Sequence, residues 1–230
     1  MKVRIKFSKQ GAMKFIGHLD VMRYFQKAIR RAHIPIAFTE GFSPHMVMSF
    51  ASPLGLGLTS DAEYMDIEVL EPIPSKEAVR RLNQVMVEGM NVLSYRKIPE
   101  GKANNGMALV DMADYTVTFR EGYAPEPGWE RQLQEFYRQP AILMQKTTKK
   151  GERTVDIRPS IHSLEVRDGS IALRVSAGSK DNLKPELVME AFAAYLGEEY
   201  SAYALLINRE EIYAENGSSL EELGEEILGA

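Results

Sequence analysis

The chain contains no cysteine, a single tryptophan and four histidines among its 230 residues. The missing thiols exclude disulfides, thiolate-ligated metals and cysteine-ligated iron–sulfur clusters within this chain. An absence of cysteine is typical of a reducing compartment, so we expect a cytoplasmic protein. No stretch approaches the roughly 18 uncharged apolar residues that a membrane-spanning helix needs, and we therefore expect no membrane partner.

Hydrophobic residues make up 44% of the chain and charged residues 26%, the composition of an ordinary globular protein. The net charge of -4 hides an uneven distribution. Residues 1–50 hold nine Lys and Arg against two acidic residues, whereas the stretch from Arg209 onward holds seven Glu and one Arg. This asymmetry favours an anionic partner for the N-terminal part. Two solvated faces that offset each other are the alternative.

The first hundred residues read as alternating strands and helices. Apolar and basic residues alternate over 1–10, which predicts a half-buried strand with Lys2, Arg4 and Lys6 on its outer face. Apolar residues at three- and four-residue spacing predict a helix from residue 17 to Pro35. Strands over 46–50 and 62–69 follow, then a helix that is capped by Ser75 and ends at Gly89, and a closing strand over 90–98.

After a turn-rich linker over 99–108, a similar order recurs. Strands are expected over 113–119, 141–148, 151–159, 161–166, 170–176 and 201–208, with helices over 128–139 and 185–197. We therefore predict an α+β protein of two ferredoxin-like (split βαβ) domains in tandem, with antiparallel sheets that carry helices on one face. The expected domains are residues 1–100 and 108–213. Residues 214–230 are expected to be an acidic tail, either a loosely docked helix or a frayed end.

The predicted first helix carries a cluster of cations, namely Arg23, Lys27, Arg30 and Arg31. Their spacing places them on one face, opposite the apolar stripe. The fork of an arginine matches phosphate oxygens, so this face favours phosphate or RNA contact. Basic residues of the first strand are expected to extend the same surface. A solvated outer helix face is the alternative.

His18 and His45 are the candidates for acid–base catalysis. His18 and Asp20 precede the basic face in a His-x-Asp arrangement, but we expect no metal site because a third ligand at suitable spacing is missing. Asp20 has a sufficient role near a helix N-terminus. The acidic residues Asp61, Glu63, Asp66 and Glu68 are interpreted as balancing the basic helix and strand or facing solvent, rather than as a cation site.

Two further segments are candidates for contacts. The loop that contains Gly41, Phe42, Ser43, Pro44 and His45 is predicted to recognise a substrate or partner, with ordinary turn structure as the alternative. A hairpin in the second half carries Lys149, Lys150 and Arg153 near its tip, where cations reach phosphates. A solvated hairpin is equally compatible with that pattern.

Taken together, several segments resemble the bacterial radical-SAM-linked protein family, a domain encoded beside or fused to a radical SAM protein. The segments are Gly-His-Leu-Asp (17–20), the basic helix, Gly-Phe-Ser-Pro-His (41–45), Leu-Gly-Leu-Gly (54–57), the strand that contains Glu63, Tyr64 and Asp66, and Val-Asp-Ile-Arg-Pro-Ser-Ile (155–161). Met46 departs from the family pattern, which has Pro there. The resemblance implies a radical SAM partner that carries the iron–sulfur cluster and S-adenosylmethionine, with no cofactor in this chain and no catalytic residue to transfer.

Our first hypothesis is therefore a non-catalytic RNA-binding or substrate-presenting partner of a radical SAM enzyme, acting in modification of transfer or ribosomal RNA. In this hypothesis the basic helix and the hairpin bind phosphates. A metal-independent RNA-processing enzyme with a His general acid–base is the second hypothesis. The third is a protein–protein adaptor that does not bind RNA.

Overall fold

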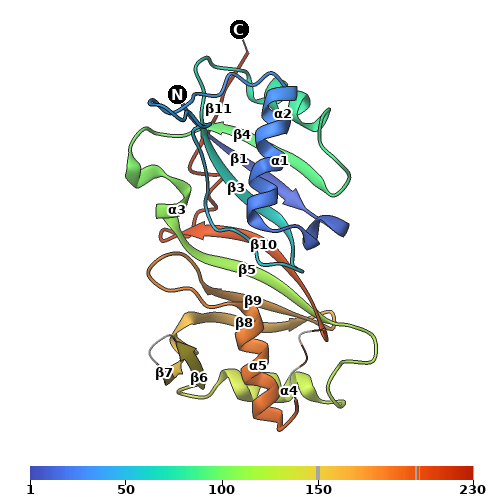
Figure 1. The fold of residues 1–230 in the computed structure, drawn as a ribbon. Helices are drawn as coiled ribbons and strands as arrows, with labels where there is room; N and C mark the ends of the chain where they lie inside the picture. The colour runs from blue at the N-terminus through green and yellow to red at the C-terminus, as the bar shows by residue number, and fades with distance from the viewer. Residues whose placement is uncertain (149–150, 200, 202, 230) are drawn as a thin grey trace. The chain divides into compact units, whose positions relative to one another are not determined.

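The protein is described by a computed structural model that covers residues 1–148, 151–199, 201 and 203–229. Two compact units make up the chain (Figure 1). Unit 1 contains Met1–Asp111 and the residues from Arg209 onward, and unit 2 contains Met112–Asn208. The chain leaves unit 1 within β5 (Val110–Phe119) and returns within β10 (Leu205–Ala214). Unit 1 is therefore built from two stretches of sequence, unlike the continuous domain expected over 1–100.

The secondary structure follows the expected order through most of the described chain. The helices are α1 (His18–Arg31), α2 (Ser75–Asn83), α3 (Gly106–Leu109), α4 (Trp129–Tyr137) and α5 (Pro185–Leu196), with short 3₁₀ segments η1 (Gly11–Phe15), η2 (Lys102–Asn104) and η3 (Arg158–Ser160). The other strands are β1 (Lys2–Lys9), β2 (Met48–Phe50), β3 (Thr59–Glu68), β4 (Met90–Lys97), β6 (Leu143–Thr148), β7 (Gly151–Asp156), β8 (Ile161–Arg167), β9 (Ser170–Ser176) and β11 (Glu225–Glu226). The α+β class with mostly antiparallel sheets is confirmed.

The sheet of unit 1 has the strand order β11-β4-β1-β3-β10, and β2 also pairs with β3. β1 lies between β3 and β4 in antiparallel register, with Ile5 opposite Met65 on one side and Tyr95 on the other. Helices α1 and α2 cover one face of this sheet (Figure 1). Alternation along β1 directs its apolar side chains to that face, where Phe7 packs on Phe25 of α1 with ring centroids 4.6 Å apart.

The opposite face of β1 carries charges that are paired inside the protein. Arg4 is buried and forms a bidentate ion pair with Asp66, at 2.8 and 2.9 Å. Lys6 donates to Glu211 at 2.7 Å and to Glu221 at 3.1 Å. The expectation that Arg4 and Lys6 extend the basic surface of α1 is wrong, because they lie on the other face of the sheet and are paired with acidic side chains. Asp66 balances the strand, as the sequence indicated.

The segment after β10 is an integral part of unit 1. Leu220 is fully buried, β11 pairs with β4, and the Ile227 N–H donates to the Ser75 hydroxyl at 2.8 Å. The prediction of a separate acidic tail is therefore wrong. Ser75 also does not cap α2 with its side chain, because its hydroxyl accepts this hydrogen bond instead. The helix ends at Asn83, before the predicted end at Gly89.

Unit 2 contains the antiparallel strand order β5-β9-β8 and a separate hairpin of β6 and β7. Helices α4 and α5 pack against each other through Phe136 and Phe192, whose ring centroids are 5.5 Å apart. Gly197 ends α5 in the left-handed conformation, with φ of 73°, as expected for a helix C-terminus.

Candidate nucleic-acid interface

Helix α1 separates its apolar and basic residues cleanly. Val21, Phe25, Ala28 and Ile29 are buried against the sheet. The four cations of the predicted basic surface, Arg23, Lys27, Arg30 and Arg31, are all exposed. We refer to these four residues as the α1 basic face. The arrangement follows from the helical period, because residues three and four apart share a face.

Acidic neighbours neutralise little of the α1 basic face. Arg23 lies 3.4 Å from the Asp20 carboxylate, and both side chains are exposed. Within the described ranges, no carboxylate lies at ion-pair distance from Lys27, Arg30 or Arg31. Arg30 and Arg31 occupy the last turn, where cations stabilise the negative end of the helix dipole. Arg23 and Lys27 lie in the middle of the helix and have no such local role.

Tyr24 connects α1 to the segment after α2. Its hydroxyl contacts the Met86 sulfur at 3.3 Å and accepts the Val87 N–H at 2.8 Å. Burial raises the pKa of Tyr24, and the Val87 hydrogen bond and the nearby Arg31 charge only partly oppose that effect. The ring therefore stays neutral and fixes the helix without adding negative charge beside Arg31.

The predicted recognition loop is a closed, protruding turn. Its base is tied by backbone hydrogen bonding from Thr39 to His45 at 2.9 Å and by the Thr39 hydroxyl, 3.1 Å from the His45 backbone nitrogen. Gly41 adopts φ of 106°, a conformation that glycine accepts without strain. Phe42 at the tip is fully exposed, as are Ser43 and Pro44 beside it.

The two histidine candidates have separate surroundings. His18 begins α1 and packs edge-on against Phe50, with ring centroids 5.0 Å apart. The His45 Nδ1 lies 3.1 Å from the Thr39 hydroxyl and 3.4 Å from the Ser43 carbonyl oxygen. His18 and His45 therefore have different side-chain neighbours, and a catalytic role for either one stays a prediction. No group of three His, Asp or Glu suited to a metal ion occurs among the residues for which placement is described.

The basic hairpin is formed by β6 and β7, with Gln145 opposite Thr154 in its register. Arg153 is exposed on β7. Lys149 and Lys150 lie outside the described residues. Because the hairpin belongs to unit 2, it is a candidate contact separate from the α1 basic face.

An exposed apolar patch lies near the start of α1, and the sequence pattern did not predict it. It consists of Phe15, Leu19 and Leu56, whose side chains are 70%, 60% and 65% exposed. The Gly57 N–H donates to the Lys14 carbonyl at 2.8 Å, which joins the segments that carry Leu56 and Phe15. We refer to these three residues as the Phe15 patch. The only sequence signal was the position of Leu19 outside the apolar stripe of α1.

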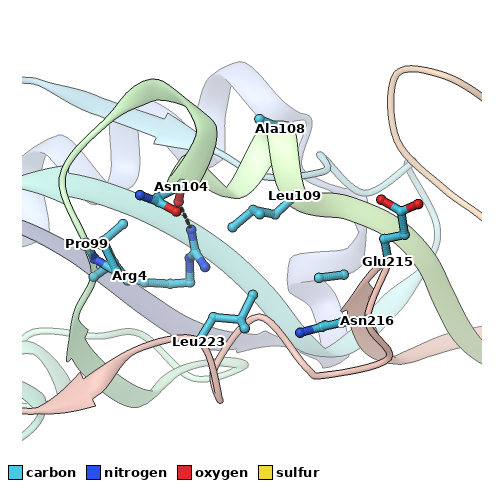
Figure 2. A pocket seen from close by; sticks show the side chains of 10 residues that line it. Arg4, Pro99, Asn104, Ala108, Leu109, Glu215, Asn216 and Leu223 are labelled. Carbon is cyan, nitrogen blue, oxygen red and sulfur yellow. Dashed lines mark hydrogen bonds between the residues drawn. The ribbon is translucent and has the colours of Figure 1, made fainter.

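Unit 1 also contains an open cavity of about 510 Å³, on the side of the sheet where Arg4 lies (Figure 2). Arg4 contributes a guanidinium that is already bonded to Asp66, to the Asn104 carbonyl at 2.9 Å and to the Leu220 carbonyl at 3.2 Å. Aliphatic side chains form most of the remaining wall. The polar residues Asn104, Glu215 and Asn216 complete the wall. The aliphatic residues are Ile98, Pro99, Ala108, Leu109, Ala214 and Leu223.

The fold and these surfaces describe an α+β protein with a basic helix face. The chain belongs to the DUF2344 family, described as an uncharacterised protein conserved in bacteria, and the match covers residues 2–185. No curated protein matches the sequence. None of the described helices is long and apolar enough to cross a membrane.

One solved structure that this chain matches is described as a Cbf5-Nop10-Gar1 complex. The similarity covers 93% of this chain at 13% sequence identity, with a TM-score of 0.43. It covers 50% of the other chain, so this protein spans about half the length of that relative.

Proposed function

We propose that this protein binds RNA through the α1 basic face and presents it, without catalysing a reaction itself, to a radical SAM enzyme. The observation that carries the proposal is the exposure of four cations on one helix, with Asp20 as the single acidic neighbour in contact among the described residues. Such a face repels itself unless an anion binds, and the phosphates of RNA are the anions that its spaced guanidinium groups suit best. We propose that the protein acts in the modification of transfer or ribosomal RNA.

The radical SAM partner follows from the sequence resemblance. In this proposal the partner supplies the iron–sulfur cluster and S-adenosylmethionine, because this chain has no cysteine to ligate a cluster. The exposed Phe42 loop is the proposed contact with the enzyme or its substrate. The protruding shape of this loop, tied at Thr39 and His45, supports that role.

A ferredoxin-like architecture also remains our proposal for each unit. In unit 1, β4-β1-β3 with β2 on the outer edge of β3 is the strand arrangement of a split βαβ fold. Strand β10 shares that edge of β3, which is an addition to the simple pattern.

RNA binding is tested by fluorescence anisotropy with labelled transfer RNA over a series of salt concentrations. The test variant combines Arg23→Ala, Arg30→Ala and Arg31→Ala. Each lost phosphate contact lowers the slope of log affinity against log salt by about 0.7 to 0.9, so we expect the loss of three contacts to reduce the slope by about 2 to 3. The control variant combines Arg131→Ala, Arg138→Ala and Arg167→Ala, three exposed arginines of unit 2 that give the same change in net charge.

Equal affinity and slope in the two triple variants would contradict the proposal. Capture of a radical SAM protein from a bacterial lysate, repeated after nuclease treatment, tests the second part. Association that survives nuclease and is lost in the α1 triple variant would instead identify the α1 basic face as a protein-binding surface.

A further inference from the structure

The Phe15 patch exposes large apolar side chains beside a helix whose apolar stripe of Val21, Phe25, Ala28 and Ile29 is buried. Phe15 ends η1, Leu19 lies in the first turn of α1, and Leu56 lies in the loop between β2 and β3. Three large apolar side chains exposed on neighbouring segments form a surface of the kind that binds a partner.

Hydrogen bonds from buried cations to backbone carbonyls hold the segments that carry Phe15 and Leu56 in place. The Lys9 ammonium donates to the Ile16 carbonyl at 3.1 Å, directly after Phe15. Arg209 donates to the Ser52 carbonyl at 2.7 Å, at the start of the loop that carries Leu56, and is ion-paired with Glu63. Lys9, Arg209 and Glu63 are all buried. The patch therefore stands on fixed backbone, which reduces the entropy lost when a ligand binds.

Positively charged side chains lie beside the Phe15 patch, at Lys14 and along α1. The Lys14 ammonium lies 5.2 Å from the centroid of the Phe15 ring. Leu19, Arg23, Lys27 and Arg30 follow one another at helical spacings of four, four and three, so they share one face. An aromatic ring thus precedes a row of cations that extends about 10 Å along the helix.

From this juxtaposition we propose that the protein binds RNA as a single strand, with an unpaired base stacked on Phe15 and the following phosphates on the α1 basic face. The inference rests on the proposed RNA binding and specifies the class of RNA. Aromatic rings beside a basic surface are the recognition elements for single strands, because every unpaired base offers a flat face for stacking. The bases of a duplex are already stacked on one another, so an exposed ring gains no such contact there.

The test compares a short single-stranded RNA with the same RNA annealed to its complement, using the full chain. The single strand carries a fluorescent purine analogue whose emission falls when it stacks on an aromatic ring. We expect Phe15→Ala to weaken single-strand affinity by about tenfold and to abolish the quenching. Phe15→Tyr keeps a ring and should retain both properties. Duplex binding should be weaker and insensitive to Phe15.

The matched control is Tyr203→Ala, which removes an aromatic side chain that is 80% exposed in unit 2. Because Phe15 is also largely exposed, neither alanine variant should shift the thermal unfolding midpoint. Were Phe15→Ala to unfold, the quenching by the wild type and by Phe15→Tyr would decide the question, since a purely structural ring gives none.

The outcomes separate the inference from the proposed function. If the wild type binds RNA but Phe15→Ala behaves like Tyr203→Ala, the stacking site is overturned while RNA binding stands. If neither RNA form binds, the proposed function itself is overturned. If Phe15→Ala impairs capture of a partner protein but leaves RNA binding unchanged, the patch is a protein contact and the inference is overturned.

Discussion

Removal of the Asp66 carboxylate should destabilise unit 1 strongly. The Arg4 and Asp66 side chains are 2% and 7% exposed, and each relies on the other for charge compensation. Asp66 also accepts the Gly106 N–H at 2.6 Å. Asp66→Ala therefore leaves a buried guanidinium without a counter-ion and a buried N–H without an acceptor.

The magnitude follows from these two losses. Breaking a buried ion pair from one side costs about 3–5 kcal/mol, and an orphaned buried donor costs about 1–3 kcal/mol when counted alone. Since the two losses share one carboxylate, we expect about 4 kcal/mol in total, a large fraction of the stability of a typical domain. Replacing both partners, by Arg4→Leu with Asp66→Leu, leaves no unpaired charge and should cost less than the single change.

Urea unfolding followed by far-ultraviolet circular dichroism measures this loss, with the exposed Asp20→Ala variant as the control. Trp129, the single tryptophan, lies in unit 2, so its fluorescence reports that unit separately. The reasoning would be refuted if Asp66→Ala lost no more free energy of unfolding than Asp20→Ala, or if the double variant were the less stable of the two Asp66 variants.

Two other predictions concern charge and backbone conformation. Hydrogen bonds from Arg80 and then Arg81 lower the pKa of Glu77 to about 2, so its contribution to stability is present above the ordinary value of 4.5 and is lost as the pH falls through about 2. A carboxylate titration by nuclear magnetic resonance should give this value, and Arg80→Ala with Arg81→Ala should return it toward 4.5; an unchanged pKa would contradict the assignment. Gly57 and Gly89 share a positive φ, of 85° and 86°, but only at Gly89 would a Cβ approach another backbone atom, the Gln10 oxygen, at 2.5 Å. Gly89→Ala should therefore lower the thermal midpoint more than Gly57→Ala, and equal losses would show that the backbone relaxes around the new atom.

Local periodicity predicted the elements whose pattern depends on nearby residues. The alternation of Val3, Ile5 and Phe7 predicted β1, and the apolar spacing over Val21 to Ile29 predicted α1 together with its exposed cations. Both patterns report which side of an element faces a core, a property encoded within a few turns or pairs of residues.

Such local patterns do not predict which side chains and strands pair when they are far apart in the sequence. Arg4 finds its partner Asp66 across 62 positions, so the sequence alone placed Arg4 on the wrong surface. Ser219 and Glu222 form the reciprocal hydrogen bonds of a capping box, at 2.8 and 3.3 Å, a local preference for a helix start, yet no helix follows in the described residues. Pairing of β11 with β4 and the bond from Ile227 to Ser75 favour an extended chain over that local preference.

The sequence predicted only part of the candidate site, because the rest depends on contacts between residues far apart in the chain. Exposure of the α1 basic face followed from helical geometry, whereas Phe15 could equally have been a core residue by its type. Only the backbone contact between Gly57 and Lys14 shows that Phe15 and Leu56 belong to one surface. The contact of His18 with Phe50 likewise depended on tertiary structure.

The return of the chain to unit 1 after residue 208 affects the order in which the protein is made. A ribosome completes every residue of unit 2 before it supplies Arg209 and Leu220, which fill buried positions in unit 1. Domains generally fold as units during synthesis, with the N-terminal one first. Here unit 1 must wait for the residues after Asn208 to be translated, and until then Glu63 has no Arg209 and Arg4 has no Leu220 carbonyl. A nascent chain is consequently most exposed to aggregation and proteolysis in the very unit that carries the α1 basic face.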